Sequence, residues 1–196
     1  MHEPLGFEST VGDEGGAVWF QLVWFCVILY QQQAIPFLLV SILLHFLVSP
    51  TRKIDFYLLI FISMFGVFGD VLLSFTGVYQ FPNNELIPVW LILLWCHFGF
   101  AFNHSLGWLS RFNISLIALL GAIVGPLNYL AGHRLGAVDF SYSYQITLFS
   151  IGVIWAVNLP VFIIIQRRLR ARINNEGKDH EKIDEYIHHG KPINNK

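Results

Sequence analysis

The chain has 196 residues, of which 55% are hydrophobic and 13% are charged, and its mean hydropathy is +0.55. Because soluble domains are about a quarter charged, this composition excludes a soluble globular domain and predicts an all-α, polytopic membrane protein. The net charge of −1 argues against a nucleic-acid partner, and the two cysteines lie in apolar runs, so they indicate neither a disulfide framework nor a metal-binding knuckle.

Charge divides the chain into three regions. Residues 1–16 carry four acids and no lysine or arginine, so they lack the basic region of a secretory signal. Only eight charged residues lie between residues 17 and 166, whereas the end of the chain is polar and mixed in charge. We therefore predict an acidic N-terminal tail (1–16), a transmembrane helical domain (17–167) and a polar cytoplasmic C-terminal tail (168–196).

Apolar segments separated by turn and charge signals predict a bundle of six transmembrane helices. The predicted spans are residues 17–30, 34–48, 54–79, 87–109, 114–131 and 146–166. The first two are short compared with the ~20 residues that a hydrocarbon core requires, and Pro36 suits the first turn of the second. An alternative interpretation treats residues 17–48 as one long element kinked at the proline, which gives five spans.

Lysine and arginine near the span ends predict the orientation, because cytoplasmic loops are rich in these residues. Seven of the ten Lys and Arg residues between positions 50 and 185 lie in "SPTRK", "SRFN" and "RRLRAR". With six spans, these segments and both termini are cytoplasmic, whereas "QFPNNEL" and the 132–145 loop face outward. Five spans would place the acidic N-terminal tail outside.

Asp70 is the strongest single signal for a functional site. An acid in the middle of the membrane costs at least ~2.5 kcal/mol on insertion scales, so it has a partner, faces water or is protonated. Ser63, Gly66, Ser74 and Gly77 share its face of the predicted helix, and such a small and polar stripe allows close approach of another helix. We predict that Asp70 acts as an acid or base; the alternative is a structural hydrogen bond across a helix interface.

The segment "WCHFGFAFNHSLGWL" (95–109) carries two polar faces. His97 and His104 are seven residues apart and share one face, whereas Asn103 lies with two glycines on a second, packing face. Helix rise places His97 closer in depth to Asp70, and an aspartate–histidine pair would suit proton transfer or acid–base catalysis. The two histidines lie about 10 Å apart, too far to share an ion with ~2 Å bonds, so no metal site is predicted.

Asn128 and Asn158 come from the last two spans, at about the depth of Asp70 and His97. Each alone is typical of a hydrogen bond between helices, but four polar side chains at one level predict a polar pocket. Arg134, at the outer end of its span, is a candidate for binding an anionic head group or Asp139. No cofactor motif is present, and no cofactor is predicted. The candidate catalytic residues are Asp70, His97 and His104, and the candidate binding residues are Asn103, Asn128, Asn158 and Arg134.

Four blocks of the sequence together carry a family resemblance: "HFLVSPTRKIDFYLL" (45–59), "GDVLLSFTGVYQF" (69–81), "NHSLGWL" (103–109) and "GPLNYLAGHRLGAV" (125–138). They resemble the bacterial membrane proteins of domain of unknown function 2878, over roughly residues 18–167. The resemblance implies a small multi-spanning inner-membrane protein of Gram-negative bacteria, without an established activity and therefore without catalytic residues to transfer. The shorter stretch "FGDVLL" is also similar to the Gly-Asp motif of membrane lysoplasmalogenases.

The leading functional hypothesis is a non-catalytic protein of the inner (plasma) membrane. It would bind a lipid, or bind a membrane protein that modifies lipids, or help to assemble such a partner. The small-residue packing faces and the lack of a catalytic signature favour it. The alternative is a membrane enzyme acting on a lipid, with Asp70 as acid or base and His97 or His104 assisting. A proton-coupled carrier using Asp70 ranks last, because carriers more often show an internal repeat.

Overall fold

The computed structural model describes residues 8–189. Within this range the regular secondary structure is helical apart from one pair of two-residue strands, so the all-α prediction is confirmed. Residues 1–7 of the predicted N-terminal tail (1–16) lie outside the described residues. The first helix begins at Glu8, within the rest of this predicted tail. The α-helices are α1 (Glu8–Tyr30), α2 (Ile35–Val48), α3 (Arg52–Phe75), α4 (Val89–His104), α5 (Ile114–Arg134) and α6 (Tyr144–His189).

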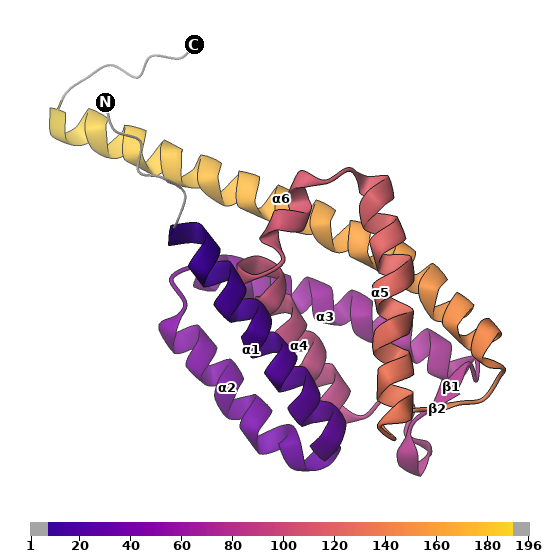
Figure 1. The fold of residues 1–196 in the computed structure, drawn as a ribbon. Coiled ribbons are helices and arrows are strands. Elements are labelled where there is room, and N and C mark those ends of the chain that lie inside the picture. The colour runs from indigo at the N-terminus through magenta and orange to yellow at the C-terminus, as the bar shows by residue number, and fades with distance from the viewer. Residues whose placement is uncertain (1–7, 190–196) are drawn as a thin grey trace.

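Helices α3 and α4 lie at the centre of the molecule (Figure 1). The α1–α2 hairpin covers one side, where both of its helices pack against α4, and α5 and α6 pack against each other on the other side. Helix α3 packs against both α4 and α6. The core therefore forms around the two central helices.

The chain turns back between α1 and α2 at the 3₁₀ helix η1 (Gln31–Ala34). Gln31 adopts a left-handed backbone conformation with φ 44°, and its side-chain amide donates a hydrogen bond to the carbonyl oxygen of Gly136 at 3.2 Å. The neighbouring Gln32 amide donates to the carboxylate of Glu85 at 3.4 Å. These contacts place η1 at the same end of the molecule as the loops that precede α4 and follow α5.

Four helical stretches are long and apolar enough to cross a membrane, by length and composition: residues 18–48, 52–75, 114–134 and 144–173. The first of them contains both arms of the α1–α2 hairpin, and α4 is a shorter apolar helix. Helices of this length and composition are those of a membrane protein. Helix α3 ends at Phe75 rather than at the predicted Tyr79, because the chain turns at Gly77, where φ is 72°.

Two short strands, β1 (Tyr79–Gln80) and β2 (Asp139–Phe140), pair antiparallel at the η1 end, with Tyr79 opposite Phe140. The pairing connects the loop after α3 with the loop before α6, and the short 3₁₀ helix η2 (Pro82–Asn84) follows β1. Tyr79 itself is completely buried. This end of the molecule is therefore closed by backbone pairing as well as by side chains.

Small residues let the helices approach closely, as the sequence predicts. A Cβ at Gly66 of α3 would collide with the indole of Trp95, and one at Gly125 of α5 would collide with the indole of Trp155. At Gly121 a Cβ would meet the main chain of Trp155 itself. Two tryptophans on α4 and α6 thus occupy the space that these glycines leave free.

Candidate functional site

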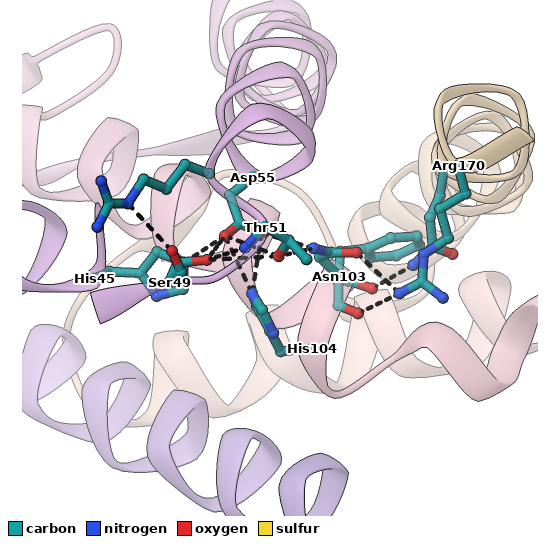
Figure 2. A network of polar contacts seen from close by, with 10 residues as sticks. His45, Ser49, Thr51, Asp55, Asn103, His104 and Arg170 are labelled. Carbon is teal, nitrogen blue, oxygen red and sulfur yellow. Dashed lines mark hydrogen bonds and ion pairs between the residues drawn. The ribbon is translucent and has the colours of Figure 1, made fainter. Parts of the chain in front are cut away.

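A cluster of polar side chains lies where α2 ends, α3 begins and α4 ends (Figure 2). Helix α2 stops at Val48 because the next residue, Ser49, precedes a proline and is extended, with φ −61° and ψ 130°. The guanidinium group of Arg52 donates to the carbonyl oxygens of Leu47 at 2.7 Å and Ser49 at 3.2 Å, which satisfies the end of α2. The tight turn brings the last turn of α2 against the first turn of α3.

Asp55 lies at the centre of this cluster, and its side chain is completely buried. Nε2 of His45 lies 3.2 Å from Oδ2, and Nε2 of His104 lies 3.0 Å from Oδ1. The Asn103 amide donates to Oδ1 at 2.7 Å, and the Ser49 hydroxyl donates to Oδ2. The Thr51 hydroxyl donates to Oδ2 at 3.4 Å. Five side chains from α2, α4 and the turn before α3 therefore converge on a single carboxylate.

The two histidines approach Asp55 together. The ring of His45 stacks on Phe100, with centroids 3.8 Å apart, and meets the ring of His104 edge-on at 5.3 Å. One ligand atom from each of His45, Asp55 and His104 lies within 4.8 Å of the other two. Imidazole nitrogens and carboxylate oxygens are the common protein ligands of zinc, so these three residues are arranged as a metal-binding set would be.

Helix α6 supports the cluster from outside. Gln166 is completely buried, and its amide donates to the carbonyl oxygen of Phe102 at 2.7 Å. Arg170 donates to the carbonyl oxygen of Asn103 at 2.7 Å and to its Oδ1 at 2.9 Å. Because Oδ1 of Asn103 accepts from Arg170, its Nδ2 is turned toward Asp55 (Figure 2). Arg170 is thus a positioning residue for the cluster.

Two adjoining pockets, of about 300 Å³ and 450 Å³, lie beside the cluster. The smaller is also lined by His97 and by Ser105, whose hydroxyl is buried without a hydrogen-bond partner among the described residues. The larger follows α2 and is lined by Phe37, Val40 and Leu44, which are 42–56% exposed. Polar groups therefore gather at one end, and apolar side chains form the rest of the wall. Both pockets are lined by Trp19, Ser41, His45 and His104.

Asp70 is a second buried carboxylate, toward the η1 end of the molecule, and it is 2% exposed. The indole N–H of Trp95 donates to Oδ2 at 2.7 Å, and the hydroxyl of Tyr79 donates to Oδ1 at 2.8 Å. The hydroxyl of Tyr129 also donates to Oδ1. These contacts tie α3 to α4, α5 and β1, which is the arrangement of an interhelical anchor. The catalytic role of Asp70 stays a prediction.

His97 does not meet Asp70 but points toward α2. Its Nδ1–H donates to the carbonyl oxygen of Leu93 at 2.9 Å, and its Nε2 lies 2.5 Å from the Ser41 hydroxyl. Trp95, two residues earlier on α4, takes the place beside Asp70 that the sequence assigned to His97. A depth count along a helix cannot distinguish these two positions, because they differ by about 200° of rotation but only ~3 Å of rise.

The remaining predicted residues do not gather around Asp70 and His97. The amide of Asn128 donates to the carbonyl oxygen of Val124 within α5 at 2.9 Å, and Asn128 lines a separate, mainly apolar pocket of about 90 Å³. Asn158 is buried close to Gly69. Arg134 is exposed. Of the four side chains that share a level in the sequence, His97 lines the smaller pocket beside the cluster, whereas Asp70, Asn128 and Asn158 line neither of the two.

Sequence reasoning missed His45 and Asp55. Both lie in "HFLVSPTRKIDFYLL", the first block that carries the family resemblance, and both flank the serine–proline turn. The two residues are ten positions apart, on either side of a tight turn between two helices. Such a turn brings the end of one helix against the start of the next, and this pattern could have found them. His104, for which spacing on its own helix gave no partner, meets Asp55 of α3.

The comparisons with known proteins give a family and no individual relative. No curated protein and no solved structure matches the chain. The model of a protein family of unknown function, DUF2878, matches residues 15–161. This range contains His45, Asp55 and His104, but it ends before the part of α6 that carries Arg170. Because the match covers most of the chain, the protein belongs to the DUF2878 family, in agreement with the resemblance of its sequence blocks.

Proposed function

We propose that the protein crosses the bacterial inner membrane six times, with both termini in the cytoplasm. The alternation of the helices between two ends supports this topology, as does the hairpin at η1, whose side chains contact the loops beyond α3 and α5. The basic residues of "SPTRK", "SRFN" and "RRLRAR" gather at the opposite end, where Arg167 donates to the carbonyl oxygens of Ser110 and Phe112. An excess of positive charge marks the cytoplasmic side.

We further propose that the protein binds one lipid molecule in the pockets between α1 and α2. The observation that carries this proposal is the distribution of polar and apolar side chains around the pockets. Apolar side chains of α2 form the wall, and the inner end is formed by histidines and by the Ser105 hydroxyl, which has no hydrogen-bond partner among the described residues. An acyl chain would lie against Phe37, Val40 and Leu44. The polar head group would reach His104 and Ser105.

The dimensions agree with such a ligand. From Phe37 to Pro50 the larger pocket follows α2 over roughly 20 Å, counting about 1.5 Å per residue. That is about two thirds of a hydrocarbon core ~30 Å thick. The polar end lies beside the basic helix ends, at the level where the head groups of the cytoplasmic leaflet would lie. Their negative surface potential would attract the same basic residues.

The test is lipid that remains bound to the purified protein. Val40→Trp should fill the groove and reduce the lipid that copurifies in detergent, measured by mass spectrometry of an extract per mole of protein. Leu39→Trp is the matched control, because Leu39 is 53% exposed on the same helix and does not line the pocket. Equal lipid content in both variants and the wild type would contradict the proposal.

A second candidate function, an enzyme that acts on the bound lipid, is favoured by the histidines at the polar end of the pocket. In this function His104 contacts the head group directly, and Asp55 with Asn103 positions it. The predicted role of Asp70 as acid or base would instead place the chemistry at the far end of α3. Asp70→Asn and His104→Gln separate the two, since each substitution affects only one of the carboxylate clusters.

A further inference from the structure

The cluster at the end of the pocket has the composition and the shape of a metal centre. We propose that His45, Asp55 and His104 bind one divalent transition-metal ion, and that this ion is zinc, because two imidazoles and one carboxylate form a ligand set of catalytic zinc sites. The three ligands come from three different helices, so they would be brought together only in the folded chain. The proposal does not depend on what occupies the pocket.

The distances fit an ion among these three residues. Zinc bonds of about 2.0–2.2 Å at tetrahedral angles place neighbouring ligand atoms about 3.4 Å apart. In the structure, Nε2 of His45 lies 3.2 Å from Asp55 Oδ2, and Nε2 of His104 lies 3.0 and 3.2 Å from the two carboxylate oxygens. These carboxylate–imidazole distances are within about 0.4 Å of the value for zinc. The ligand atoms of the two imidazoles lie within 4.8 Å of each other, so the rings would move together by up to about 1.4 Å when an ion binds.

The surroundings of Asp55 are those of a supported metal ligand. Each carboxylate oxygen accepts a hydrogen bond from outside the trio: Oδ1 from the Asn103 amide, and Oδ2 from the Ser49 hydroxyl. Arg170 in turn fixes the orientation of Asn103. Hydrogen bonds of this kind orient metal ligands and are part of most metal sites.

The negative charge of the buried Asp55 side chain also favours a bound cation. Its side chain is 0% exposed, and a buried carboxylate is paired or coordinates a metal. The guanidinium group of Arg52 donates to carbonyl oxygens at the end of α2 and in the following turn, and that of Arg170 donates to Asn103. The ion pairs described for Asp55 are those with His45 and His104. A divalent ion held jointly by the three residues would balance this charge.

Three protein ligands would leave a fourth position open. Both histidines line the pockets, so this position would face the space in which we place the polar head group. Catalytic zinc sites keep such a position for water or substrate, whereas structural sites fill all four with protein ligands. The site would therefore be able to polarise a ligand oxygen if the proposed lipid is bound.

The experiment measures metal bound to the untagged, full-length protein in detergent. After treatment with a chelator and reloading with Zn²⁺, the wild type should hold about one zinc per chain, measured by inductively coupled plasma mass spectrometry. Reloading with Co²⁺ should give the visible absorption of four-coordinate cobalt. A wild type that takes up no stoichiometric metal would overturn the proposal, whatever lipid copurifies with it.

Two variants distinguish a metal site from a purely hydrogen-bonded cluster. In His45→Gln and His104→Gln, the new amide can still donate to Asp55, but it is a poor ligand for zinc. Both variants should lose the stoichiometric zinc and the cobalt spectrum, whereas His97→Gln, in the same pocket, should keep them. Asn103→Leu should retain the ligands and bind zinc 10–100-fold more weakly, the usual effect of losing a supporting hydrogen bond.

The folding of each variant is checked by size-exclusion chromatography and thermal unfolding. Folded His45→Gln and His104→Gln proteins that keep one zinc per chain would overturn the assignment of these ligands. If either variant fails to fold, the effect of Asn103→Leu on zinc affinity decides instead, and unchanged affinity would contradict the site. Because the readout is metal content, its result is independent of the lipid measurement on Val40→Trp.

Discussion

At the scale of single residues, the protein contains two buried aspartates with different partners. Asp70 is surrounded by an indole and two phenol groups, which donate hydrogen bonds and connect neighbouring elements. Asp55 faces two imidazoles at the edge of a pocket. An indole cannot accept or release a proton near neutral pH, and it does not ligate metals. The chemistry of the partners therefore separates an anchor from a candidate site.

This distinction predicts the effect of substitutions at Asp70. Asp70→Leu removes the acceptors of three buried donors and should lower the free energy of unfolding by about 3 kcal/mol or more, at ~1–3 kcal/mol for each unsatisfied group. Asp70→Asn should cost about 1 kcal/mol, because its oxygen can accept from Trp95 while its amide donates to a tyrosine hydroxyl. Both values would come from unfolding in detergent.

The control for these variants is Asp139→Leu, because the Asp139 side chain is 83% exposed. Surface substitutions of this kind stay within about 0.5 kcal/mol. A folded, stable Asp70→Leu protein would contradict the anchoring role. A stable Asp70→Asn protein that loses turnover of the bound lipid would instead support the predicted acid–base role.

At the scale of the elements, the helix pairs are joined by tryptophans that pack on glycines. Trp95 of α4 lies over Gly66 of α3, and Trp155 of α6 lies over Gly125 of α5. The two indoles also stack on each other, with centroids 5.5 Å apart. Phe98 and Phe102 of α4 also contact aromatic rings of α6. The two central helices and the α5–α6 pair thus share an aromatic cluster, which connects the anchor at Asp70 to the far side of the bundle.

Close packing makes Gly121 intolerant of a side chain. Gly121→Ala would place its Cβ against the main chain of Trp155, which cannot move without displacing α6. We expect a loss of about 1–3 kcal/mol in the free energy of unfolding, the usual effect of overpacking. Gly132→Ala is the control on the same helix, because its Cβ would make ordinary contacts at 3.8 and 4.0 Å. Equal stability of the two variants, measured by thermal unfolding, would contradict the packing of α5 on α6.

At the scale of the whole molecule, the two ends differ in chemistry. One end holds η1, the strand pair and the loops that contact Gln31 and Gln32. The other holds the Asp55 cluster and the basic stretch of α6 (Figures 1 and 2). If positive charge marks the cytoplasmic side, the candidate site lies at the inner face of the membrane.

Accessibility of introduced cysteines checks this orientation. In a Cys26→Ser, Cys96→Ala background, the Gln32→Cys and Asn84→Cys variants should react with a membrane-impermeant maleimide applied to intact cells. The Pro50→Cys variant should react only after the membrane is permeabilised. Reaction of Pro50→Cys in intact cells would reverse the orientation. A Gln32→Cys variant that reacts from neither side would support five spans instead of six.

The membrane class and the helix positions could be predicted from the sequence, because hydropathy is a local property. A run of apolar residues requires a lipid or protein environment wherever it lies, and turn residues interrupt it at the same positions in any fold. The four sequence blocks that carry the family resemblance are also local patterns, which can be read without knowledge of the fold. The small-residue faces could also be predicted, since spacing along a helix determines which residues share a face.

The sequence by itself thus determined that the chain is all-helical, which segments form its apolar helices to within a few residues at most ends, and that Asp70 needs partners. Only the tertiary structure decided which residues those partners are, and it placed His45, Asp55 and His104 next to one another. The physical reason is that contacts between helices depend on the rotation of each helix and on the turn that joins them. A periodic pattern gives the faces of one helix, but not the residue that meets it from another.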